Sequence, residues 1–227
     1  MENINEDKTC YASQEQREVL INLVTNPAIE EKFFLTGGTA LSVFYLYHRV
    51  SNDLDLFTVQ SIDLGEIDFW IKTRWPKDST KIRMSPQFLS LLIKDVKVDF
   101  VIDPLSINEH RTKFMFENGH YVSVDTITNI VSNKFCAVIS RIEPKDFVDF
   151  YMLMEIFPGF RIEDIYKLSK LKDAVFDDPP TVAFQLEMGV EFIKENPVVM
   201  PQLYKQIDLE DFFDFYKKVA VWLYKLL

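Results

Sequence analysis

The sequence predicts an α+β protein, with a mixed sheet and flanking helices followed by a C-terminal helical bundle. Up to about residue 124, the short apolar and alternating runs that are typical of strands occur between helical patterns. Beyond that residue, apolar side chains recur almost wholly at helical spacing. With 227 residues, 48% of them hydrophobic, the chain can bury a sizeable core. We therefore expect a sheet domain over residues 1–124 and a helical domain over residues 125–227.

The stretch FFLTGGTALSVFYLYHRVSNDLDLFT, residues 33–58, organises the expected sheet domain. Its first three residues are an apolar run that predicts a buried strand. Gly37 and Gly38 then permit a sharp turn and the close approach of a ligand to the backbone. Residues 39–47 have helical spacing, so unpaired N–H groups near Gly38 and Thr39 would face whatever binds there. A phosphate group suits that position.

Asp53 and Asp55 are the next feature of this stretch. Alternate side chains of a strand share a face, so both carboxylates point to one side while Leu54 and Leu56 point into the core. Two carboxylates beside an expected phosphate site predict a magnesium and nucleotide site.

Asp99 is the candidate for a third carboxylate. It lies in the middle of the strand pattern over residues 96–102, where most neighbours are apolar. A lone carboxylate in such a run is unfavourable unless it is paired or bound to a metal. The alternative is a charge on the solvent face of a half-exposed strand, and the Asp53 and Asp55 pair favours the catalytic interpretation.

Other elements are expected on either side of these motifs. Residues 13–24 have a helical pattern that Ser13 can cap. The Asn-Gly pair at residues 118–119 predicts a hairpin. The remaining expected elements are strands at residues 88–93 and 96–102 and helices at residues 62–75, 125–141, 144–157, 161–172, 181–194 and 209–226.

Two cations interrupt the apolar stripe of the helix expected at residues 125–141. Lys134 could reach a triphosphate with Arg141 nearby, or both side chains could extend past the edge of the stripe into solvent. On the following helix, Asp146 and Asp149 share a face. These two acids could pair with Lys134, Arg141 or Lys145, one of them could act as a base, or either alone could be a solvated surface charge.

Composition excludes several classes of protein. The chain has 25 basic and 35 acidic residues, a formal charge of −10, and lacks the basic domain usual in proteins that bind duplex nucleic acid. Cys10 and Cys136 form neither a disulfide framework nor a metal-binding pattern, so we expect no disulfide partner. The acidic N-terminus does not resemble a signal peptide, and no apolar run is long enough to span a membrane. We therefore expect a cytoplasmic protein without a membrane partner.

The stretch over residues 33–58 resembles the signature of the DNA polymerase β-like nucleotidyltransferase superfamily, in which glycines open a helix before an Asp-hydrophobic-Asp motif. More narrowly, GGTAL, His48-Arg49, Ser51 and DLDLF resemble the AbiEii/AbiGii abortive-infection toxin family. The run KVDF, which contains Asp99, is similar to the third-carboxylate strand of that family. Lys134, Arg141 and KDFVD at residues 145–149 are similar to its later Lys…Arg…Arg-Asp-x-x-Asp motif, with Lys145 where arginine is more usual. The resemblance covers about residues 33–157.

This resemblance implies a polymerase-β-like nucleotidyltransferase fold in which the helical domain completes the active-site cleft. It implies that Asp53, Asp55 and Asp99 bind Mg²⁺ or Mn²⁺, that Lys134 contacts the phosphates of an NTP and that Asp146 is catalytic. The expected nucleotide-binding residues are Gly37, Gly38, Thr39, Lys134 and Arg141. The implied activity is transfer of an NMP group from NTP to an RNA or protein acceptor, a reaction of the EC 2.7.7 type. Such a protein would be the toxin of a toxin–antitoxin or phage-defence pair, with a cognate antitoxin as a possible partner.

Two other functions are compatible with the sequence. A metal-dependent glycosyltransferase also uses an Asp-x-Asp motif, although it does not account for the glycine turn or the later lysine helix. A partner-binding protein with a degenerate nucleotidyltransferase site is the non-enzymatic alternative, and the intact Asp53, Asp55 and Asp99 count against it.

Overall fold

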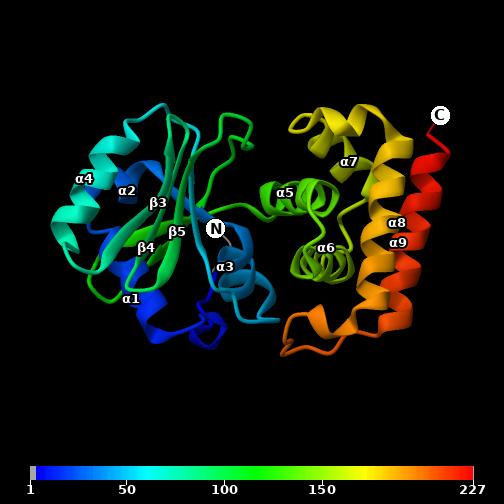
Figure 1. Cartoon of the computed structure of the whole chain (residues 1–227), viewed down its shortest axis with the longest axis horizontal. Helices are drawn as coiled ribbons and strands as arrows, with labels where there is room; N and C mark the ends of the chain where they lie inside the picture. The colour runs from blue at the N-terminus through cyan, green and yellow to red at the C-terminus, as the bar shows by residue number, and fades with distance from the viewer. Residues whose placement is uncertain (1–3, 227) are drawn as a thin grey trace. The chain divides into compact units, whose positions relative to one another are not determined.

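The computed structural model describes residues 4–226 of the chain and divides it into two compact units, Met1–Ile127 and Thr128–Leu227 (Figure 1). The first unit contains the whole sheet, and the second is helical. The boundary expected from the sequence lies at residue 124. The α+β class and the C-terminal helices that the sequence predicts are confirmed.

The sheet of the first unit has seven strands in the order β3-β4-β5-β2-β1-β7-β6. These strands are β1 (Phe34–Thr36), β2 (Leu54–Thr58), β3 (Ser79–Ser85), β4 (Phe88–Ile93), β5 (Val96–Ile102), β6 (Thr112–Met115) and β7 (Tyr121–Val124). The pairs β2–β5 and β1–β7 are parallel and the other pairs are antiparallel, so the sheet is mixed. The bounds of β4 and β5 coincide with the predicted strands, whereas the edge strand β3 was not delimited in the sequence.

Most helices of the first unit contact strands of this sheet (Figure 1). The helices of this unit are η1 (Lys8–Cys10), α1 (Gln14–Leu23), α2 (Pro27–Lys32), α3 (Gly37–Leu41), the π-helical segment η2 (Ser42–Leu46) and α4 (Leu64–Arg74). Ser13 caps α1, as predicted, by accepting a hydrogen bond from the Gln16 N–H. The short helix α2 is absent from the sequence prediction, since six residues carry too little periodicity to reveal a helix.

The alternation read from the sequence agrees with the burial of β2 and β5. Leu54 and Leu56 are buried, whereas Asp55 between them is partly exposed. Phe100 of β5 packs edge-on against Phe33, with ring centroids 5.3 Å apart. One face of these two central strands therefore belongs to the core, which leaves the other face for the polar residues.

The second unit is built from α5 (Ile127–Ser140), α6 (Pro144–Ile156), α7 (Ile162–Lys170), η3 (Ala174–Asp177), α8 (Pro179–Glu195), η4 (Pro197–Val199) and α9 (Leu209–Tyr224). Helices α8 and α9 run antiparallel and side by side (Figure 1). Its core is aromatic: Phe135 of α5 stacks on Phe150 of α6 with centroids 4.7 Å apart, and Phe176 packs edge-on against Phe135. Such rings bury a large apolar area per residue, which suits a small helical unit.

The two ends of α5 differ from the sequence prediction. Helix α5 begins at Ile127 rather than Asp125, and it ends at Ser140, so Arg141 lies just beyond it. The Asp125 carboxylate is fully buried and accepts hydrogen bonds from the Thr36 hydroxyl at 2.6 Å and from Arg111 at 2.9 Å. Asp125 therefore joins the end of β1 to the segment before β6.

Candidate active site

The glycine turn after β1 lies directly beside the Asp55 carboxylate. Gly37 has φ of +67°, a conformation that side-chain-bearing residues rarely adopt. A Cβ atom at Gly37 would lie 2.2 Å from Oδ2 of Asp55, because Asp55 stands opposite Thr36 in the antiparallel pair of β1 and β2. Glycine is thus required at this position both by the backbone and by the carboxylate that covers it.

Thr39, on the other side of the turn, holds the segment that leads into β2. This residue is fully buried, and its hydroxyl donates a short hydrogen bond to the Asp53 carbonyl. Its Oγ1 also lies 3.0 Å from Oγ of Ser51. The Thr39 side chain therefore positions the backbone of Asp53, and the predicted contact of Gly37, Gly38 and Thr39 with a nucleotide remains a prediction.

The register of the two central strands brings two of the predicted carboxylates together. Asp55 of β2 stands directly opposite Asp99 of β5 in a parallel pair. Side chains of opposed residues in neighbouring strands project from the same face of the sheet. Asp53 immediately precedes β2, two residues before Asp55. The structure thus places Asp55 and Asp99 as neighbours on one face, as the sequence hypothesis requires.

Lys97, which the sequence analysis did not single out, completes this group. Its Nζ lies 2.8 Å from Oδ2 of Asp99, and the hydroxyl of Ser90 donates to Oδ1 of Asp99 at 2.5 Å. Partial burial by itself would lower the pKa of Lys97. The hydrogen bond to Asp99 and the negative charges of Asp99, Asp53 and Asp55 outweigh that effect and raise the pKa. The three acids are therefore close enough to act electrostatically on one ammonium group.

The carboxylate chemistry suits a hard divalent cation, but the arrangement is not a ready-made three-carboxylate site. In the described part of the chain, residues 4–226, no three His, Cys, Asp or Glu side chains are grouped so that they could hold a metal ion. Both oxygens of Asp99 already accept hydrogen bonds, one from Ser90 and one from Lys97. Metal binding by Asp53, Asp55 and Asp99 therefore remains a prediction.

Arg49 and Ser51 are two further residues that the structure adds beside the glycine turn. Arg49 is only 4% exposed, and its guanidinium lies so close to Gly38 that a Cβ atom there would be 2.8 Å from Nη2. Ser51 Oγ would lie 2.9 Å from the same atom. Both residues occur in the sequence motif but carry no periodic signal of their own, so only the packing around Gly38 identifies them.

A second charged group, in the helical unit, contains the remaining predicted residues. Lys134 Nζ lies 2.7 Å from Oδ1 of Asp146 and 2.6 Å from Oδ2 of Asp149. Nε of Arg141 lies 2.8 Å from Oδ2 of Asp146. The Lys134 side chain is 8% exposed, and those of Asp146 and Asp149 are fully buried. The two acids are therefore paired with Lys134 and Arg141 and are not solvated, whereas a role of either acid as a base remains a prediction.

Burial and charge act in opposite directions on Asp146. Burial would raise the pKa of its carboxyl, but the charges of Lys134 and Arg141 and their hydrogen bonds hold that pKa below its usual value. Tyr216 of α9 packs nearby and donates to the Phe147 carbonyl at 2.6 Å, while burial and the charges of Asp149 and Asp146 raise the pKa of its hydroxyl. The tyrosine therefore remains neutral and links α9 to α6.

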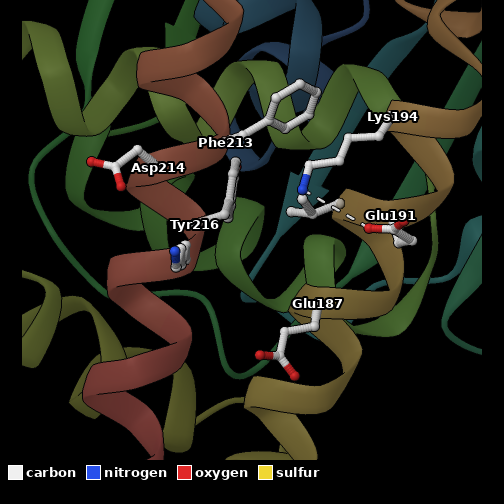
Figure 2. Close-up of a pocket in the computed structure, with 8 residues that line it drawn as sticks. Glu187, Glu191, Lys194, Phe213, Asp214 and Tyr216 are labelled. Carbon is white, nitrogen blue, oxygen red and sulfur yellow. Dashed lines mark ion pairs between the residues drawn. The ribbon is translucent and has the colours of Figure 1, made fainter.

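A pocket of about 510 Å³ lies between α8 and α9 in the same unit (Figure 2). Val190, Phe213 and Tyr216 form its apolar part, and its charged residues are Glu187, Glu191, Lys194, Asp214 and Lys217. Figure 2 shows Lys194 reaching toward Glu191, and its Nζ lies 5.2 Å from the ring centroid of Phe213. No residue predicted from the sequence for the active site lines this pocket.

Comparisons with known proteins agree with the fold. The sequence model of a family described as "Nucleotidyl transferase AbiEii toxin, Type IV TA system" matches residues 19–216. A Helicobacter pylori protein assigned as a nucleotidyltransferase has a similar structure, with a TM-score of 0.57 at 19% identity, covering 95% of this chain and 97% of its own. JHP933 from Helicobacter pylori gives 0.56 at 18% identity, covering 95% and 94%.

A third solved structure, MenT4, is a nucleotidyltransferase toxin from Mycobacterium tuberculosis H37Rv. It has a TM-score of 0.49 at 12% identity and covers 91% of this chain and 82% of its own. None of the curated proteins compared matches the chain. The likeness to the two Helicobacter pylori structures confirms the polymerase-β-like nucleotidyltransferase fold expected from the sequence. Among the described residues, no helix is long and apolar enough to cross a membrane.

Proposed function

The chain belongs to the AbiEii family of nucleotidyltransferase toxins, and from that premise we propose that it transfers an NMP group from an NTP to an RNA or protein acceptor. The observation that carries this proposal is the position of Asp55, which lies over Gly37 and opposite Asp99. A carboxylate pair next to a glycine turn places charge where a metal-bound triphosphate can be held.

The proposed reaction is a displacement at the α-phosphorus of the NTP. An oxygen of the acceptor forms a bond to that phosphorus while the bond to the pyrophosphate oxygen breaks, and the proton of the acceptor passes to a base. A divalent ion, Mg²⁺ or Mn²⁺, would neutralise the developing phosphate charge when bound by Asp53 and Asp55. Gly37 and Gly38 allow the backbone to approach the phosphates, and buried Arg49 adds positive charge beside Gly38.

The roles proposed for the helical unit depend on a buried ion-pair group. Lys134 is proposed to contact the NTP phosphates, with Arg141 beside it and Asp146 as a catalytic residue. Because Lys134 is held by Asp146 and Asp149, its ammonium is fixed in position before any nucleotide binds. A fixed cation loses less conformational entropy on binding a phosphate than a free lysine would.

The biological part of the proposal follows from the family description. A toxin of a type IV system implies a cognate antitoxin as a possible partner. A role in phage defence and a cytoplasmic location remain predictions. The family match gives no support to the glycosyltransferase alternative.

The test is a transfer assay with each labelled NTP, magnesium and total cell RNA or protein. Asp55→Asn should lower transfer at least about a hundredfold, because it removes one negative charge without changing side-chain shape. Asp95→Asn is the matched control, since this exposed acid lies in the β4–β5 turn, where asparagine tolerates φ of +63°. Equal transfer by Asp55→Asn and the intact chain would refute the proposal, provided that thermal melting shows both to be folded.

A further inference from the structure

Lys97 contacts Asp99, one of the three carboxylates proposed to bind a metal ion. Its ammonium lies 2.8 Å from Oδ2 of Asp99, and Ser90 holds the other carboxylate oxygen at 2.5 Å. Lys97 and Asp99 are two residues apart on β5, so the strand geometry keeps both side chains on one face. The strand geometry therefore keeps the lysine within reach of Asp99.

The two partners differ in their access to solvent. The side chain of Asp99 is 11% exposed, whereas that of Lys97 is 42% exposed. The carboxylate is fixed by Ser90 in the adjacent strand β4, which pairs with β5 at this residue. The lysine can move away along its flexible stem while Asp99 stays in place.

We propose that Lys97 is a tethered cation that competes with a divalent metal ion for Asp99. The ammonium group occupies one of the two lone-pair directions of Oδ2 and places a positive charge beside any ion that Asp99 would coordinate. The positive charge of Lys97 also repels a divalent ion held by Asp53 and Asp55. Free divalent ions are thus bound weakly by the first unit, although the carboxylates are in place.

This inference rests on the acid site of the proposed function, but its test measures ion binding and not transfer. Titration calorimetry with Mn²⁺ alone is carried out on the full chain without nucleotide. Lys97→Met removes the charge and keeps most of the side-chain volume, and Lys97→Gln removes the charge while keeping a hydrogen-bond donor for Asp99. Lys77→Met, in the exposed α4–β3 segment, is the matched control.

Both Lys97 variants should bind Mn²⁺ roughly three- to tenfold more tightly than the intact chain, and the Lys77 variant should not differ from it. Lys97→Arg should bind Mn²⁺ as weakly as the intact chain. Adding Asp55→Asn to Lys97→Met should abolish the gain, which assigns the ion to this site. Unchanged, weaker or undetectable Mn²⁺ binding by the folded Lys97→Met and Lys97→Gln variants would overturn the inference.

The two proposals fail separately. If Mn²⁺ binding tightens as expected but Asp55→Asn still transfers nucleotide, the competition is real and the proposed function is wrong. If transfer requires Asp55 but the Lys97 variants bind Mn²⁺ no better than the intact chain, the function stands and the competition is wrong.

Discussion

The two charged groups of this protein are built from the same residue types but differ in burial. In the sheet unit, Asp53, Asp55 and Asp99 act on a single lysine, Lys97, whose side chain is 42% exposed. In the helical unit, two acids are matched by two cations, and three of these four side chains are buried. The partly exposed lysine makes the sheet group the more accessible of the two, whereas the buried ion pairs of the helical group also join α5 to α6.

Breaking a buried ion pair lowers the free energy of unfolding more than breaking a partly exposed one. The two groups can therefore be distinguished by measuring stability. The Lys134 ammonium holds Asp146 and Asp149 at 2.7 and 2.6 Å. If it were lost, Asp149 would remain buried without that partner, whereas Asp99 without Lys97 would keep its hydrogen bond from Ser90. The cost to stability should therefore be much larger in the helical unit.

The largest predicted effect is that of Lys134→Met, which should lower the free energy of unfolding by about 3–5 kcal/mol. Lys97→Met, the counterpart in the sheet unit, should change it by about 1 kcal/mol or less, since the lysine is 42% exposed and Asp99 keeps its hydrogen bond from Ser90. Urea denaturation followed by circular dichroism measures both changes. Equal losses in the two variants would show that the groups do not differ in the way described.

A smaller effect is expected from packing around α6, the helix that carries both buried acids. A Cβ atom at Gly189 of α8 would lie 2.1 Å from Cζ of Phe147. Gly189→Ala should therefore lower the free energy of unfolding by about 1–3 kcal/mol, because the ring has to move within a filled core. Thermal melting of Gly189→Ala measures this effect. The double variant Phe147→Leu/Gly189→Ala should melt at a higher temperature than Gly189→Ala, because the smaller leucine side chain relieves the clash.

Gly159→Ala provides the control for that experiment, since nothing lies within 4 Å of its added Cβ. It should leave the melting temperature nearly unchanged. A Gly189→Ala variant as stable as Gly159→Ala would mean that α6 and α8 are not packed tightly enough to fix the buried acids.

The smallest effect concerns pH. Because the pKa of Asp146 is held below its usual value of 3.8, its ionised form stabilises the folded state. That contribution is fully present above the unfolded-state pKa and is lost as the pH falls through the lower folded-state pKa. The stability difference between the intact chain and Asp146→Asn should therefore shrink below about pH 4.

Acid titration of unfolding free energies, measured in urea at a series of pH values, tests this expectation. Asp164→Asn, on the exposed side of α7, should differ little from the intact chain at every pH. A difference between Asp146→Asn and the intact chain that grows as the pH falls would contradict the assigned sign.

Much of the sheet unit could be predicted because its signals are local. The alternation in β5, the Ser13 cap and the Asn-Gly hairpin each depend on residues within a few positions of one another. By contrast, α2 was missed and β3 was not delimited, since a six-residue helix and an exposed edge strand have no clear apolar period. The spacing of Asp53 and Asp55 could likewise be seen in the sequence, but the residues that lie opposite them in the neighbouring strands could not.

The sequence by itself determined the α+β class, the glycine turn and the acids that follow it, because backbone preference and side-chain alternation act over short distances. Only the tertiary structure decided which charges meet. The register of β2 and β5 sets Asp55 opposite Asp99, and the packing of α5 on α6 buries Lys134 between two carboxylates. These pairings join residues far apart in the chain, and periodicity within one element cannot specify its partner in another.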